Sequence, residues 1–239
     1  MHQTITIAKR ELSGLFYSPI AYVVLGVFAL VSTLLFLMHF GPGMQADLRG
    51  ESRWIVWLMV FLVPAISMRL LSEEYRSGTI EPLMTSPVSD TQVIVGKWLG
   101  AMGFLLVLLS PLLGHVLMLE FTADPDYGPI FTVLVGLVAV GGLYLAIGTF
   151  ASATTQNQII AFLLTVFITG FLTIGLYALP QWSVVTGPVR QAMFFLNVDR
   201  QFDAFAKGLI DTSNFVYFLS GTGLFLFLAV VFLQSKRWR

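Results

Sequence analysis

Six long apolar stretches constrain the fold of this 239-residue chain more than any other feature. A helix needs about 20 mostly apolar residues to cross the roughly 30 Å hydrocarbon core of a bilayer. Each stretch reaches or approaches that length, none contains an acid, and the only basic residue inside them is Arg69. The sequence therefore predicts an all-α integral membrane protein whose six transmembrane helices are Ile20–Phe40, Trp54–Leu71, Trp98–Leu119, Ile130–Phe150, Ile159–Leu179 and Phe215–Leu233.

Composition supports a membrane protein. Charged residues make up 11% of the chain, against about 25% in an ordinary soluble domain, so a water-solvated surface is hard to build. The formal net charge is zero, and nothing indicates a nucleic-acid partner. Cysteine is absent, which excludes disulfides, thiolate metal sites and thiol nucleophiles.

The distribution of basic residues predicts the orientation. Six spans place both termini on one side of the membrane. Eight of the 13 basic residues fall on that side: Lys9, Arg10, Arg69, Arg76, Lys97, Lys236, Arg237 and Arg239. Since positive charge is concentrated in cytoplasmic segments, both termini are predicted to be cytoplasmic.

Residues 1–18 are not predicted to be a cleavable signal peptide, because the apolar run that follows is too long. They form an amphipathic pattern that predicts a helix in the cytoplasmic membrane interface. An irregular polar leader is the alternative. The apolar face comprises Ile5, Ala8, Leu12, Leu15 and Phe16, with Lys9, Arg10 and Ser13 largely opposite.

The cytoplasmic connection 72–90 is the most informative segment. Gly78 is a natural end for a charged helix that continues span two, and Thr79 can cap a new short helix with Glu81 in its first turn. Ser86-Pro87 ends that helix, because the residue before proline leaves the helical region. Ser89–Gln92 then predicts a capping box for the third span. The short helix would carry Ile80, Leu83 and Met84; a plain interfacial loop is the alternative.

The residues of this connection, Glu73 to Leu83 and Thr85 to Ser89, resemble the cytoplasmic loop of ABC-2 type permeases, which carries a coupling helix. The family commonly has an apolar residue where this chain has Pro82. Three further segments resemble the gliding-motility-type branch: 18–23, 64–69 and 202–211. The resemblance covers nearly the whole chain and implies one transmembrane domain, 1–239.

The resemblance implies that Glu73, Glu74 and Arg76 fix the cytosolic end of span two by ion pairing. It implies that ATP-driven motion enters through residues that contact a separate ABC ATPase: Gly78, Thr79, Ile80, Glu81, Pro82, Leu83 and Met84. A second permease subunit would complete the complex in a bacterial cell membrane, with export the expected direction. A mechanotransmission complex acting on a membrane-anchored extracytoplasmic protein is the alternative.

No motif for catalysis, metal binding or cofactor binding is found. The chain lacks the phosphate-binding G-x-x-x-x-G-K-[ST] loop, so ATP and Mg²⁺ are expected on the partner ATPase. An ion-coupled secondary transporter would need acids near the midplane, and the spans contain none. His115 lies at membrane depth, either as a functional group or as a neutral histidine bonded to a neighbouring carbonyl.

The outer segment 180–214 predicts an amphipathic helix, interfacial or re-entrant. Its apolar residues recur at helical spacing: Phe202, Phe205, Ala206, Leu209 and Ile210. On the other face, Asp203 can pair with Lys207. Small residues in the spans, including Gly96 with Gly100 and Gly148 with Ser152, predict close packing within the bundle or at a subunit interface.

Overall fold

The computed structural model describes residues 2–41, 47–79, 88–122, 125–181 and 187–237. All regular elements in these ranges are helical, so the predicted all-α class is confirmed. Six helical stretches of the described residues are long and apolar enough to cross a membrane: Pro19–His39, Arg49–Ser77, Asp90–Thr122, Tyr127–Thr154, Gln158–Gln181 and Thr212–Ser235. The last five each contain one predicted span, and the first ends one residue before the predicted end at Phe40.

Three of the six spans are interrupted, which the apolar pattern does not reveal. The order of elements is α1 (His2–Phe16), α2 (Pro19–His39), α3 (Arg49–Ser67), α4 (Ser72–Ser77), α6 (Asp90–Leu108), α7 (Pro111–Thr122), α8 (Tyr127–Thr154), α9 (Gln158–Gly170), the π-helix η1 (Phe171–Gly175), α10 (Leu176–Ala178), the 3-10 helix η2 (Leu179–Gln181), α11 (Gly187–Leu196), α12 (Val198–Ala206) and α13 (Thr212–Arg237). Spans two, three and five are therefore α3–α4, α6–α7 and α9–η1–α10.

The three breaks differ in their local structure. Proline has no N–H and its ring clashes with the preceding turn, so Pro111 starts α7 as a separate helix after α6. Pro64 lies in the last turn of α3, four residues before the chain leaves the helix at Met68. In span five the backbone widens into one π-helical turn at Phe171–Gly175.

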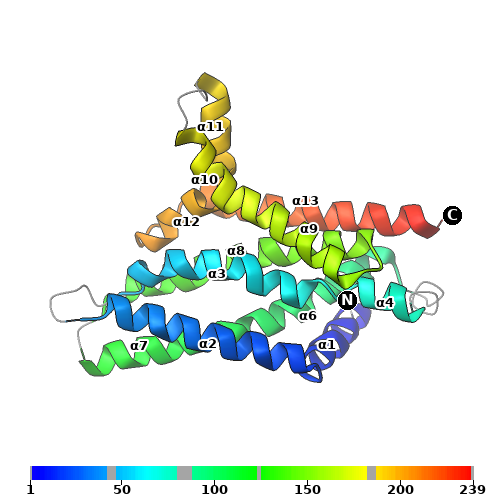
Figure 1. The fold of residues 1–239 in the computed structure, drawn as a ribbon, viewed down its shortest axis with the longest axis horizontal. Helices are drawn as coiled ribbons and strands as arrows, with labels where there is room; N and C mark the ends of the chain where they lie inside the picture. Colours follow the sequence, from blue (N-terminus) through cyan, green and yellow to red (C-terminus); the bar gives the residue numbers. More distant parts are fainter. Residues whose placement is uncertain (1, 42–46, 80–87, 123–124, 182–186, 238–239) are drawn as a thin grey trace.

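The fourth span, α8, is the centre of the bundle. It packs against α3, α6, α9, α12 and α13, and most of its side chains are buried. Figure 1 places both chain termini and α4 at one end of the bundle, and the C-terminal ends of α2 and α7 at the other. We call these the termini end and the far end. The two termini lie together, as an even number of spans requires.

Candidate functional site

α4 is a six-residue helix at the termini end. Glu73 and Glu74 lie in its first turn, where the helix dipole favours acids, and Arg76 lies in its last turn. Gly78 follows with a φ of 73°, a left-handed conformation that glycine adopts without strain. The predicted stop at Gly78 is confirmed, as is the predicted capping box at Ser89, which starts α6.

Only the beginning of the predicted coupling segment belongs to the described part of the chain. Thr79 is exposed, and its hydroxyl lies 2.9 Å from that of Ser77. The other five predicted coupling residues lie outside the described residues: Ile80, Glu81, Pro82, Leu83 and Met84. The predicted short helix there stays a prediction.

A buried lysine joins α4 to two other helices. Lys97 of α6 is 1% exposed; its Nζ lies 2.8 Å from Oε2 of Glu11 in α1 and 2.9 Å from Oε1 of Glu74 in α4. Arg10 of α1 lies 3.5 Å from the same Glu74 oxygen. The two cations and two anions balance in number: Lys97 and both acids are largely buried, whereas the Arg10 side chain is 62% exposed. We call these four residues the Lys97 cluster.

Two glycines let α1 approach α6 closely enough for this cluster to form. A Cβ at Gly96 would lie 2.9 Å from Cβ of Ile7, and one at Gly100 would lie 2.7 Å from the carbonyl oxygen of Ala8. The predicted close packing at these glycines is therefore confirmed, and it involves α1. Ile7 is the side chain of α1 that packs against Gly96, whereas Ile5, on the predicted apolar face, is 51% exposed and free to contact a membrane interface.

The break between α3 and α4 is held by α8. The Ser152 hydroxyl accepts hydrogen bonds from the backbone N–H groups of Leu71 and Ser72, each at 2.9 Å, and donates one to the Met68 carbonyl at 3.1 Å. One turn earlier, a Cβ at Gly148 would overlap the hydroxyl of Ser67. The predicted packing of Gly148 and Ser152 is confirmed, and Ser152 satisfies the backbone groups that the break leaves unpaired.

Arg69 makes a further attachment. Its Nε lies 3.0 Å from Oε2 of Glu73, and its guanidinium also donates to the hydroxyl of Ser18, which precedes α2. The predicted ion pairing of Glu73 and Glu74 is thus present, with Arg69 and the Lys97 cluster as the partners. Arg76 is exposed and makes no ion pair with the residues that the structure describes.

These contacts define what the arrangement can do. α4 is fixed to α1 and α6 by the Lys97 cluster, to α8 by Ser152, and to the start of α2 by Arg69. A displacement of α4 would therefore be passed to four other helices through short polar contacts.

At the far end, α12 caps the bundle. Phe202 and Phe205 are buried, as predicted, and their rings pack on Gly136 of α8. Asp203 pairs with Lys207 at 2.5 Å, also as predicted, and with Arg53 of α3 at 3.1 Å.

Asp199 of α12 is 2% exposed and pairs with Arg53 at 3.4 Å. Burial raises the pKa of its carboxyl group above the usual value of 3.8, while Arg53 and a hydrogen bond from the Trp57 indole lower it. These contacts tie α12 to the outer turn of α3.

The predicted continuation of this helix through Leu209 and Ile210 is wrong. α12 ends at Ala206, and Gly208 adopts a φ of 83°. The N–H of Leu209 then bonds to the carbonyl of Ala204, and that of Gly208 to Phe205, which is the Schellman pattern of a helix end. Leu209 and Ile210 are 62% and 57% exposed. Gly208, which lies within the apolar pattern, is the sequence feature that could have indicated where the helix ends.

His115 makes contacts that the sequence did not predict. Its Nε2 lies 3.2 Å from the hydroxyl of Thr33, and its Nδ1 lies 3.5 Å from Oε1 of Glu51. Phe36 stacks on the ring at 4.6 Å. In place of the expected bond to a neighbouring carbonyl, His115 contacts side chains of α2 and α3. His115 therefore links these two helices to α7. Glu51 was missed because it precedes the apolar stretch of span two.

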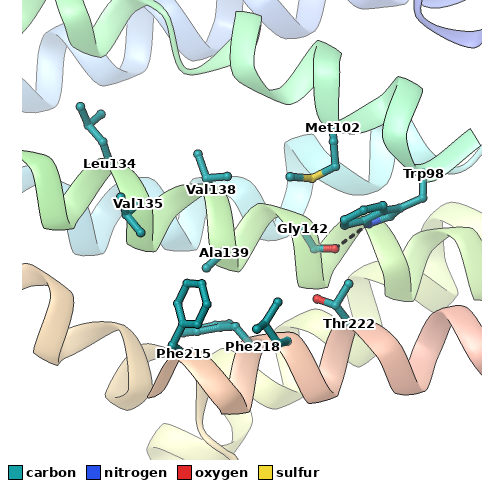
Figure 2. A pocket seen from close by; sticks show the side chains of 11 residues that line it. Trp98, Met102, Leu134, Val135, Val138, Ala139, Gly142, Phe215, Phe218 and Thr222 are labelled. Atoms are coloured by element: carbon teal, nitrogen blue, oxygen red, sulfur yellow. Dashed lines mark hydrogen bonds between the residues drawn. The ribbon is translucent and has the colours of Figure 1, made fainter. Parts of the chain in front are cut away.

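An apolar hollow of about 450 Å³ opens between α6, α8 and α13 (Figure 2). The Trp98 indole lies at one end of it, near Thr222, and donates a hydrogen bond to the Gly142 carbonyl at 3.0 Å. Around it lie chiefly aliphatic and aromatic side chains: Met102, Leu134, Val138, Ala139, Phe215 and Phe218. Its lining suits hydrocarbon, and it includes none of the four residues of the Lys97 cluster.

Comparison with protein families identifies the family of this chain. A family model described as "ABC-2 family transporter protein" matches residues 52–198, which extend from the start of span two to the outer segment. No curated protein matches the chain.

Proposed function

The chain belongs to the ABC-2 family of transporter proteins, and on that premise we propose that it is a permease subunit moved by a separate ABC ATPase. The proposal rests on one observation, the Lys97 cluster. It binds the short helix α4 rigidly to α1 and α6 immediately before the connection that the resemblance identifies as the ATPase contact.

In this proposal the termini end faces the cytoplasm, in accord with the excess of basic residues there. ATP and Mg²⁺ bind to the partner ATPase, and this chain performs no hydrolysis. Closure of the ATPase pair pushes on the segment from Gly78 to Met84. The push passes through α4 to α1 and α6, and tilts spans two and three. Two permease subunits enclose the path, export is the direction, and the gliding-motility-type branch is the closest subtype.

One observation favours a second candidate, a mechanotransmission complex that acts on an extracytoplasmic protein. α11 projects from the bundle, and none of its residues is buried. Such a helix could carry motion to a membrane-anchored partner without any solute crossing. Structures with and without nucleotide separate the two candidates, because only a transporter opens a continuous path between its subunits.

A charge-reversal series tests the proposal. Arg76→Glu changes an exposed residue of α4, and Glu81→Lys changes the predicted coupling helix. Each should reduce co-purification of the ATPase and the stimulation of its ATP hydrolysis, while the chain still inserts in the membrane. Lys207→Glu likewise reverses an exposed cation, at the far end, and should leave both readouts unchanged. Full coupling in both test variants would refute the proposal.

A further inference from the structure

Two arginines of the outer segment share one aromatic ring. The Cζ atom of Arg190 in α11 lies 5.5 Å from the centroid of the Phe194 ring, and that of Arg200 in α12 lies 4.4 Å from it. Stacking on a ring restrains a guanidinium and leaves the N–H groups at its edge available to an acceptor. The ring thus gathers two positive charges between α12 and α11, the helix that projects from the bundle in Figure 1.

These two arginines differ from the other described cations of the far end. Arg49 pairs with Asp47, Arg53 with two acids of α12, and Lys207 with Asp203. Arg190 and Arg200 form no ion pair with any residue that the structure describes. Two cations brought together without an acid repel each other unless an anion joins them.

A hollow of about 410 Å³ lies beside them, between α11, α12 and the first turn of α13. Its lining contains no acid, and it offers several hydrogen-bond donors: the Arg200 guanidinium, the Gln191 and Asn214 amides and the Ser213 hydroxyl. Two acids close in sequence to lining residues are engaged elsewhere: Asp199, which precedes Arg200, pairs with Arg53 at 3.4 Å, and Asp211 caps α13, accepting from the Ser213 N–H at 3.0 Å.

We propose that this hollow binds a phosphate group, which Arg200 contacts directly and whose charge Arg190 helps to balance. Phosphate suits the site better than carboxylate, because it offers more acceptor oxygens to a guanidinium fork, amides and a hydroxyl that line one hollow. The phosphate can belong to an anionic lipid headgroup or to a soluble phosphate. The inference does not depend on the ATPase partner.

The test uses the full chain and two probes. In liposomes, spin-labelled phosphatidylglycerol is compared with spin-labelled phosphatidylcholine for association with the protein. In detergent, inorganic phosphate is titrated calorimetrically. The double change Arg190→Gln with Arg200→Gln should lower the relative association of the bound probe on the order of tenfold. Lys207→Gln, which removes a cation already paired with Asp203, should change it by less than about twofold.

Arg190→Lys with Arg200→Lys keeps the charge but loses the planar fork, so it should retain only part of the association. It also remains informative if the glutamine variant does not fold. Phosphatidylglycerol preference lost in the glutamine variant and kept in Lys207→Gln identifies a lipid site. Inorganic phosphate binding with the same variant pattern, and no lipid preference, identifies a soluble ligand. The proposal is overturned if neither probe binds the wild-type protein, or if either double variant binds as well as the wild type. It is also overturned if Lys207→Gln weakens binding as much as the glutamine double variant does.

Discussion

Replacing Lys97 with methionine should destabilise the protein by several kcal/mol. Lys97→Met keeps most of the side-chain volume but removes the cation that Glu11 and Glu74 share at 2.8 and 2.9 Å. The side chains of these acids are only 15% and 16% exposed, and only Glu74 keeps another cation, Arg10. Removing one partner from a buried pair costs about 3–5 kcal/mol, because it leaves an uncompensated charge.

For a globular protein of this length, each kcal/mol shifts the unfolding midpoint by roughly 2–4 °C, so Lys97→Met should lower it by about 6–20 °C. Thermal unfolding in detergent, followed by loss of the monodisperse gel-filtration peak, measures the shift. Lys9→Met makes the same change at an exposed position of α1 and should shift the midpoint by no more than a few degrees. Adding Glu11→Gln to Lys97→Met should restore part of the loss. Equal midpoints for the Lys97 and Lys9 variants would refute the role given to the cluster.

Gly148→Ala should lower the free energy of unfolding by about 1–3 kcal/mol, because the added Cβ would overlap the Ser67 hydroxyl. Gly114→Ala is the control: its added Cβ would meet no atom within 4 Å, so the same unfolding assay should show almost no change. Ser152→Ala should cost about 1–3 kcal/mol by leaving two N–H groups at the α3–α4 break unpaired; a loss below 0.5 kcal/mol on the same scale would contradict this. Burial raises the pKa of Asp199, so its contribution to stability is fully present below pH 3.8 and is lost as pH rises through the folded pKa. The midpoint of Asp199→Asn relative to wild type should therefore rise between pH 4 and pH 7, and a fall would show that pairing with Arg53 outweighs burial.

The features predicted correctly are those that depend on residues close in sequence. Apolar runs of span length indicate the six helices, and short motifs indicate the stop at Gly78 and the capping box at Ser89. The i, i+4 pair of Asp203 and Lys207 is likewise local. The helix stop, the capping box and the ion pair each form between residues within one or two turns of the same helix.

The features that were missed depend on how helices meet. Lys97 and Glu11 are 86 positions apart, and nothing in either local pattern indicates that they face each other. The same is true of Ser152 and the α3–α4 break, and of His115 and Glu51. An apolar run shows that a segment can cross a membrane. Its hydropathy does not reveal a break in the helix when the freed backbone groups are hydrogen-bonded to another helix.

Site-specific cross-linking tests the central claim most directly, that the chain is driven through the connection that follows α4. Because the chain has no cysteine, Ser77→Cys introduces a single thiol at the end of α4, and Leu209→Cys introduces one on an exposed residue at the far end. In membranes that contain the ABC ATPase, a short bifunctional cross-linker should join the ATPase to the chain at position 77 and not at position 209. Capture at position 209 alone, or at neither position while the complex stays active, would contradict the account.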